Sequence, residues 1–155
     1  MGTLTIEYEE IPVAGFSKEL TVLHEESMMA LEKAYAPYSN FSVGAGILLE
    51  NGEIVTGNNQ ENAAYPSGLC AERVAFFKLR SEQLTPIRTV MVVTRNQKGL
   101  RGASFPCGAC RQVMLEYAEN QETPISILMQ KNADYFLKIN DLRALLPFSF
   151  TNKIL

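Results

Sequence analysis

The cysteines of this 155-residue chain fall in two short motifs, which constrain the fold more than any other feature. Cys70 opens the sequence Cys-Ala-Glu-Arg, and Cys107 and Cys110 stand within Pro-Cys-Gly-Ala-Cys-Arg. A catalytic zinc ion takes three ligands from the protein and leaves a fourth position open. Cys107 and Cys110 have the spacing at which one turn presents two sulfurs to a metal, while Cys70 must come from a separate element. The sequence therefore predicts one zinc ion per chain, in a site that only the tertiary fold completes.

Two other uses of these cysteines stay open on the residues alone. A closed structural zinc site needs a fourth protein ligand, and the only histidine, His24, is expected on the exposed face of a helix. A redox protein would use Cys107 and Cys110 free of metal. Because three cysteines cannot all pair in disulfides, they fit metal binding in a reducing cytosol. We expect a cytoplasmic protein with a catalytic zinc site.

Length and charge limit what the chain can bind. The 155 residues suit one domain over residues 1–155, with a sizeable core. The formal net charge of −3 offers no basic surface to a phosphate backbone, so polymeric nucleic acid is not expected as a partner. No apolar run approaches the roughly 18 residues of a membrane span. The first twenty residues also lack a basic stretch followed by an apolar one, so a membrane partner is not expected either.

The spacing of apolar residues predicts alternating helices and strands. Helices are expected over residues 17–36, 69–80 and 107–117, with a short one at 140–147, and strands over residues 41–49, 53–57, 87–94, 124–129 and 135–137. Residues 1–15 have weak strand character suited to an edge or an arm. Asn51-Gly52 is a typical two-residue hairpin turn, and the glycines of 41–49 permit close backbone approach. This order predicts a central sheet with helices on both faces.

The residues around the cysteines supply a general base and counter-charges. Both motifs are expected at helix starts, where free amides and the helix dipole favour thiolate over thiol. Glu72 can act as general base toward the attacking water without binding the metal, or can lie on the helix surface. Arg73 and Arg111 can offset the charge of three thiolates through hydrogen bonds to sulfur, or can lie on the surface. The polar segment 58–65 is either a solvated linker or a mounting for binding groups.

Four stretches together resemble the cytidine deaminase family, specifically its small homotetrameric kind with three cysteine ligands. These stretches are residues 38–46, residues 59–65 with Asn59-x-Glu61, Cys70-Ala71-Glu72, and Pro106-Cys107-x-x-Cys110. The resemblance spans nearly the whole chain and implies an α/β fold, a three-layer αβα sandwich with a central mixed β-sheet. It also implies zinc-dependent hydrolytic deamination of cytidine and deoxycytidine to uridine and deoxyuridine with release of ammonia, as in pyrimidine salvage.

The same resemblance implies roles for individual residues. Phe41 is similar to the aromatic residue that packs near the pyrimidine of the nucleoside. Asn59 and Glu61 are similar to the pair that holds the ribose hydroxyls. The amide of Ala71 would meet the pyrimidine carbonyl oxygen, and the carboxylate of Glu72 would meet the ring N3 and the leaving amine.

The C-terminal tail carries one further predicted site residue, and the chain departs from the family pattern at two places. Phe150 resembles an aromatic residue that reaches a neighbouring subunit's site, which implies a homotetramer with shared active sites; a tail docked on its own core is the alternative. Phe105 stands where the family commonly has a small residue such as serine, and Phe148-Ser149 where glycine and alanine are more usual. The alternative functions are a blasticidin-type aminohydrolase, which acts on a modified cytosine nucleoside, and a non-catalytic structural zinc module.

Overall fold

The centre of the molecule is a mixed sheet of six strands in the computed structural model, which describes residues 1–82, 85–99 and 101–151. The strands are ordered β1-β6-β5-β4-β2-β3. β4 (Ile87–Arg95) and β5 (Ser126–Gln130) run parallel, and all other neighbouring strands are antiparallel. The remaining strands are β1 (Glu9–Pro12), β2 (Ser42–Leu49), β3 (Ile54–Asn58) and β6 (Tyr135–Ile139).

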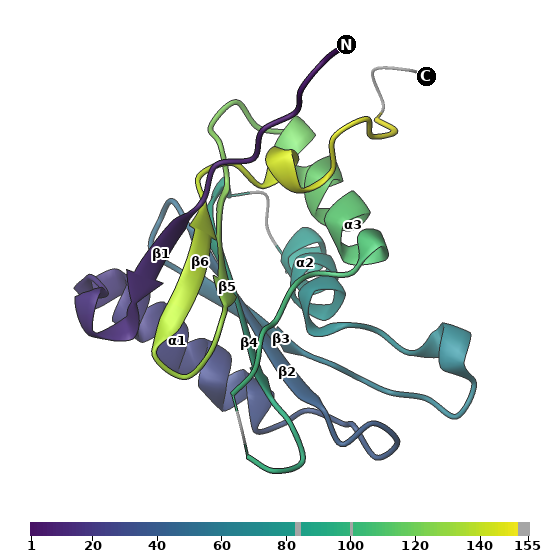
Figure 1. Cartoon of the computed structure of the whole chain (residues 1–155). Helices are drawn as coiled ribbons and strands as arrows, with labels where there is room; N and C mark the ends of the chain where they lie inside the picture. The colour runs from purple at the N-terminus through teal and green to yellow at the C-terminus, as the bar shows by residue number, and fades with distance from the viewer. Residues whose placement is uncertain (83–84, 100, 152–155) are drawn as a thin grey trace.

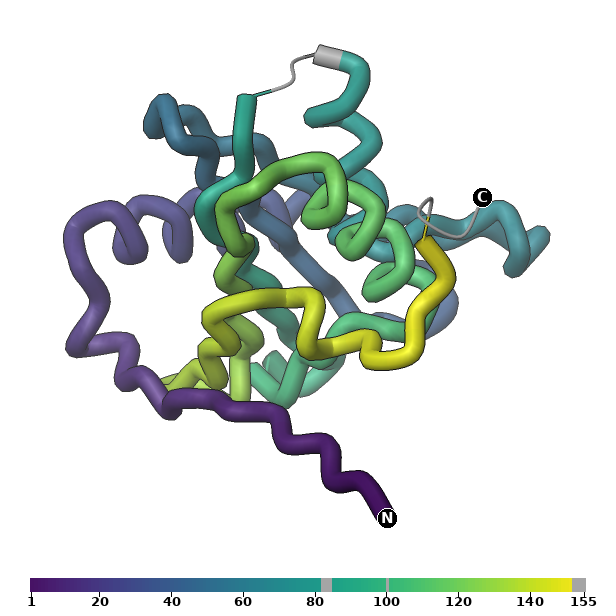
Figure 2. Tube along the Cα trace, turned by 90° about the horizontal axis from the view of Figure 1, so that it is seen from above, coloured from purple at the N-terminus to yellow at the C-terminus, as the bar shows by residue number. Residues whose placement is uncertain are grey.

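Among the described residues, three α-helices cover the two faces of this sheet (Figure 1). α1 (Lys18–Leu31) lies on one face, and α2 (Ala71–Glu82) and α3 (Gly108–Glu119) lie next to each other on the opposite face (Figure 2). The part of the chain that the structure describes also contains three short 3-10 helices: η1 (Val13–Gly15), η2 (Tyr65–Ser67) and η3 (Leu142–Leu145). This arrangement confirms the predicted three-layer αβα sandwich. No helix in the described part of the chain has the length and apolar character needed to cross a membrane.

β2 is packed on both faces because its successive side chains point to opposite sides of the sheet. Ile47 belongs to the core beneath α2 and α3, whereas Leu48 belongs to the core beneath α1. Gly44 and Gly46 also face α1, and a Cβ at Gly44 would collide with the carbonyl oxygen of Ser27. Helix α1 therefore rests directly on the backbone of β2, as the small residues of this strand predict.

Local signals place the element boundaries close to where the sequence predicts them. The Ser17 hydroxyl caps α1 by accepting a hydrogen bond from the amide of Leu20 at 3.3 Å. The β2–β3 hairpin turns where the sequence predicts, but through three residues, 50–52, rather than two, because the amide of Leu49 donates to the carbonyl of Glu53 at 2.9 Å. Gly52 has a φ of 86°, which favours glycine. All but two residues of β4 are buried, as expected for a strand covered on both faces.

Three further details differ from the expectations. α1 ends at Leu31, with Glu32 as its C-cap, rather than at residue 36. His24 is half-buried rather than exposed, because its ring packs edge-on against Phe16 and Phe136 at centroid distances of 5.9 and 5.6 Å. The last helix is a single 3-10 turn, η3, capped by Asp141, whose side chain accepts from the amide of Arg143 at 3.1 Å. Residues 1–15 do contribute an edge strand, β1, on the outer side of β6.

Candidate active site

The three cysteines meet at the starts of two neighbouring helices. Cys70 immediately precedes α2, Cys107 is the N-cap of α3, and Cys110 lies in the first turn of α3. The Sγ atoms of Cys70 and Cys107 are 3.9 Å apart and those of Cys107 and Cys110 are 3.5 Å apart. Two ligand sulfurs of a tetrahedral zinc, with bonds of about 2.3 Å, lie about 3.8 Å from each other. The three thiols therefore fit one zinc ion.

This cluster has the ligand number of a catalytic zinc site. No further His, Cys, Asp or Glu of the described residues joins the three cysteines. His24 belongs to α1, which covers the opposite face of the sheet, so it cannot supply a fourth ligand. Three ligands leave one coordination position for water or substrate.

Hydrogen bonds within the cluster prepare one cysteine to bind metal as a thiolate. A hydrogen bond from the Cys110 thiol lowers the pKa of Cys70 to about 5, although burial acts in the opposite direction. The same contact raises the pKa of Cys110. The guanidinium of Arg73 lowers the pKa of Cys70 further, because its Nη2 lies 4.0 Å from the sulfur. The same Nη2 also donates to the carbonyl of Gly68 at 3.4 Å. Arg73 is thus a cation beside the thiolates, where the sequence predicts one.

Arg111 is placed differently from the sequence expectation. Its Nε donates to the carbonyl of Pro106 at 2.9 Å and its Nη1 to the carbonyl of Leu145 at 3.2 Å, instead of to sulfur. Arg111 follows Cys110 directly in α3, so its side chain points about 100° around the helix axis from that of Cys110. Arg111 therefore ties the cysteine loop to the C-terminal segment.

Glu72 is a buried carboxylate beside the cysteine cluster. Its side chain comes from the first turn of α2, is only 5% exposed and lines the same cavity as Cys70. Burial raises the pKa of Glu72, and the charge of Cys70 raises it further. This burial excludes the alternative of a glutamate on the helix surface. A carboxylate with a raised pKa can both accept and return a proton near neutral pH. Ala71 precedes it, and its amide is one of the first N–H groups of α2, which lack helical partners.

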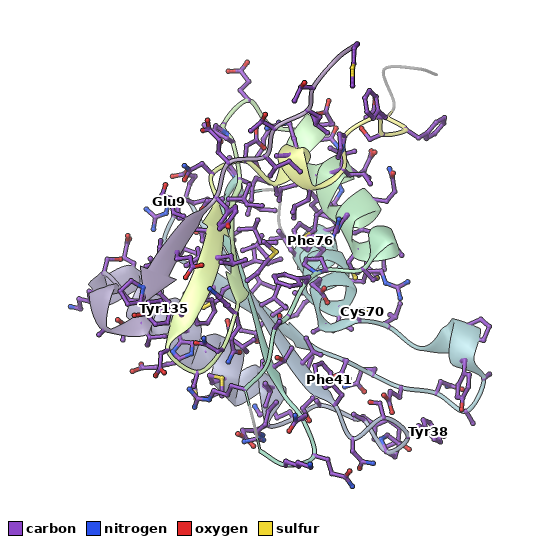
Figure 3. The ribbon with its side chains drawn as sticks, in the orientation of Figure 1. Glu9, Tyr38, Phe41, Cys70, Phe76 and Tyr135 are labelled. Atoms are coloured by element: carbon purple, nitrogen blue, oxygen red, sulfur yellow. The ribbon has the colours of Figure 1, made fainter. Side chains whose placement is uncertain are left out.

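A cavity of about 830 Å³ opens over Cys70, Cys107 and Glu72. It is lined by three of the five residues that the sequence predicts for the nucleoside, Phe41, Asn59 and Glu61, whereas Ala71 and Phe150 are not among its lining residues. Figure 3 shows Phe41 at the start of β2 and Cys70 at the start of α2 on the same side of the molecule, with Tyr38 farther out. Phe105, which stands where the family commonly has a small residue, also lines the cavity. The lining further includes residues to which the sequence assigns no individual role: Ser39, Val43, Tyr65, Val92, Thr94 and Ser104. No local pattern marks Thr94 or Ser104, which reach the cavity only through the packing of β4 and the loop before α3.

Asn59 fixes one wall of this cavity. Its Oδ1 accepts from the amide of Val43 at 2.8 Å, and its Nδ2 donates to the carbonyl of Phe41 at 2.9 Å. The side chain is 91% buried, so these bonds are shielded from water. Asn59 therefore holds the start of β2 against the end of β3.

Glu61 fixes the loop before β2. One carboxylate oxygen, Oε2, accepts from the amide of Tyr38 at 2.9 Å, and the other, Oε1, accepts from the hydroxyl of Ser39. The hydrogen bond from Ser39 lowers the pKa of Glu61 below its ordinary value, so the side chain stays ionised at neutral pH. A charged acceptor thus stands in the cavity wall.

The C-terminal segment, as far as residue 151, lies beside α3 and contributes no residue to the cavity lining. The side chain of Gln112 donates to the carbonyl of Phe150 at 2.9 Å. The Phe150 ring is 59% exposed, the Phe148 ring is fully exposed, and neither belongs to the described residues that line the cavity. The alternative of a tail docked on its own core is therefore wrong for both aromatic rings.

Comparisons with known proteins agree with this site. The pattern of the family described as "Cytidine and deoxycytidylate deaminase zinc-binding region" matches residues 17–123, which include the three cysteines and Glu72. The cytidine deaminase of Sporosarcina psychrophila is 40% identical over 128 residues, covering 83% of this chain and 88% of that protein. The cytidine deaminase of Halalkalibacterium halodurans is 44% identical over 95 residues, covering 61% of this chain and 69% of that protein.

The fold has the same relatives among solved structures. The 1.6 Å crystal structure of cytidine deaminase from Burkholderia pseudomallei superposes with a TM-score of 0.71 and 36% identity, over 84% of this chain and 98% of that one. The resemblance predicted from the sequence is thereby confirmed, and the chain belongs to the cytidine and deoxycytidylate deaminase zinc-binding family.

Proposed function

We propose that this protein is a zinc-dependent cytidine deaminase, which hydrolyses cytidine and deoxycytidine to uridine and deoxyuridine with release of ammonia. The observation that carries the proposal is the buried Glu72 carboxylate beside three thiols that fit zinc, in one cavity with Phe41, Asn59 and Glu61. Relatives named cytidine deaminase, at 40 and 44% identity, support it. Such an enzyme serves pyrimidine salvage, and its free thiols suit the cytoplasm.

Glu72 performs the proton transfers of this reaction. A bound zinc supplies Lewis-acid activation of the attacking water. Glu72 takes a proton from that water and gives it to the ring N3 as the oxygen adds to C4 of the cytosine. It then moves the second proton to the amino group, the C4–N bond breaks, and ammonia leaves. Because burial raises its pKa, Glu72 binds each proton firmly enough to carry it between these atoms.

The remaining cavity residues hold the substrate in place. The apolar side chains of Phe41 and Val43 face the planar base and exclude water from it. The amide of Ala71 donates to the pyrimidine carbonyl oxygen, and Asn59 and Glu61 bind the hydroxyls of the sugar. Each of these groups is anchored in a helix start or a hydrogen-bonded loop, so little ordering is needed when the nucleoside binds.

A structural zinc module does not account for this arrangement. Such a site is closed by four protein ligands, and the described residues bring only three cysteines together. It also gives no reason to bury a carboxylate, because an unpaired buried charge destabilises a fold. The buried Glu72 therefore favours catalysis over a purely structural role.

The activity is tested by following the ultraviolet absorbance change with cytidine, deoxycytidine and blasticidin S under identical conditions. We expect rapid turnover of cytidine and deoxycytidine, and slower turnover of blasticidin S, because Asn59 and Glu61 offer partners for sugar hydroxyls. Turnover of blasticidin S alone would instead assign the chain to the aminohydrolases. If the zinc-loaded protein deaminated none of the three, the proposal would be wrong.

We further propose that the protein is a homotetramer with shared active sites. The segment between β3 and α2, residues 59–70, projects from the body of the molecule (Figure 1), and Tyr65 on it is 77% exposed. Phe148 and Phe150 are also exposed, and the cavity is open to solvent in the single chain. We infer that a partner subunit covers these exposed aromatic side chains and the open side of the cavity. In the proposed tetramer, Phe150 of one subunit closes the cavity of the next.

Mixed oligomers test this sharing. Glu72→Gln subunits lack the proton carrier, and Phe150→Ala subunits lack the proposed covering ring. Hybrids formed by mixing them are expected to be more active than the mean of the two parents, because some sites combine an intact Glu72 with an intact Phe150 from different chains. Light scattering should give the mass of four chains. A fully active monomer, or hybrids that only average the parents, would show that each chain completes its own site.

A further inference from the structure

The hydroxyl of Ser39 joins two parts of the cavity wall. It donates to Oε1 of Glu61 at 2.5 Å and accepts from the amide of Phe41 at 3.0 Å. The amides of Tyr38 and Ser39 donate to the other oxygen of Glu61, Oε2, at 2.9 and 3.3 Å. Glu61 lies 22 residues beyond Ser39 in the sequence, so these bonds fasten the β3–α2 segment to the loop before β2.

These hydrogen bonds fix the orientation of the Glu61 carboxylate and leave it one free acceptor position. An ionised carboxylate has about four acceptor positions, and three are filled by one hydroxyl and two amides. Because Glu61 lines the cavity, the remaining position is available to a bound molecule. A carboxylate can only accept, so its partner must be a donor such as a sugar hydroxyl. The three donors also fix the direction in which this last acceptor is presented.

The base-binding wall is held by the same network. The carbonyl of Phe41 accepts from Asn59, and the amide of Phe41 donates to Ser39. The backbone of Phe41 is therefore held on both sides. Of the two contacts of the Ser39 hydroxyl, the one with Glu61 is the shorter and is made to a charged acceptor, which strengthens it.

We propose that Ser39 is a positioning residue for recognition of the nucleoside sugar. Its hydroxyl holds the Glu61 carboxylate so that the free acceptor position meets a sugar hydroxyl. Ser39 itself lies at the outer part of the cavity and takes no part in proton transfer. This inference rests on the proposed deaminase function and adds to it the residue that orients the sugar-binding carboxylate.

Kinetics of Ser39→Ala with two substrates test the proposal. With cytidine, KM is expected to rise about fivefold while kcat stays within about twofold, because a hydrogen bond that orients the substrate is lost and the chemistry is untouched. With 2′,3′-dideoxycytidine, which has no hydroxyl on those two carbons, KM should change by less than about twofold. Ser39→Thr keeps a hydroxyl and should restore cytidine binding.

The control is Ser42→Ala, since Ser42 starts β2 next to Phe41 and its hydroxyl makes no hydrogen bond among the described residues. It should leave KM unchanged for both substrates. Glu61→Gln should show the same selective loss with cytidine, so the result does not depend on one variant. An equal KM increase with both substrates would mean that Ser39 only shapes the Phe41 wall, and an effect no larger than that of Ser42→Ala would also overturn the proposal. Absence of turnover by the unmodified protein would overturn the deaminase function, and this inference with it.

Discussion

Glu72→Gln is expected to lower kcat for cytidine by about 10⁴ or more, because one carboxylate serves as base and then as acid. Glutamine has nearly the same shape and still forms hydrogen bonds, but it cannot carry a proton from water to the ring N3 or to the leaving amine. The variant should keep its fold, since replacing a buried charge with a neutral amide relieves desolvation. Zinc content should also remain at about one per chain, because the three thiols are untouched.

Zinc analysis and circular dichroism run beside the kinetics separate loss of chemistry from loss of structure. Glu116→Gln is a suitable control, because Glu116 is an exposed glutamate on the neighbouring helix α3. It should turn over cytidine like the unmodified protein. Near-normal activity in Glu72→Gln would remove Glu72 from the mechanism and leave its burial without a catalytic reason.

Replacing Cys70 and Cys107 together with alanine is expected to remove the metal. Cys110 alone then remains of the three ligands, and a single thiol does not hold zinc against the buffer. Zinc should fall below about one tenth of an ion per chain, and cytidine turnover should fall below detection. Added zinc should raise the melting temperature of the metal-free unmodified protein but not that of the double variant, since only the former has the complete site.

Elemental analysis after dialysis measures this effect, and Glu72→Gln provides the matched comparison. Glu72→Gln should keep zinc but lose activity, whereas the cysteine double variant should lose both zinc and activity. Stoichiometric zinc in the cysteine double variant would mean that other residues bind the metal.

The elements of the fold were predictable where short stretches of sequence carry their own signals. The Ser17 cap, the Asn51-Gly52 turn and the apolar run of β4 each act over a few residues, and each lies where the pattern predicts. The clustering of the three cysteines was predictable for a different reason. Cysteine is rare in this chain, and the motifs around Cys70 and Cys107 leave few other uses for it.

Side-chain partners that come from distant parts of the chain were not predictable from such patterns. His24 has charged neighbours in sequence, yet its ring is covered by Phe16 and Phe136, which come from other elements. Arg111 follows a metal ligand but turns toward Leu145. In both cases the position along one helix was right and the packing decided the contact.

The same limit applies to the nucleoside wall. Asn59 and Glu61 could be proposed from family resemblance. Their bonds to residues 38–43, however, depend on the start of β2 lying beside the end of β3. Ser39 sits in a loop of common turn formers and has no distinguishing spacing. Its proposed role follows only from the positions of its two hydrogen-bond partners, Glu61 and Phe41.

The placement of the cysteines at two helix starts also sets an order of events during folding. Cys70 and Cys107 are separated by 37 residues, among them α2 and β4, so the metal closes a long loop. Closing such a loop is entropically unfavourable until the sheet has brought its ends together. We therefore expect zinc to bind after α3 has docked beside α2, which stopped-flow refolding with and without zinc would test. We expect a chain without the ion to form its sheet and helices. The free zinc concentration then sets how much the metal stabilises the contact between the starts of α2 and α3.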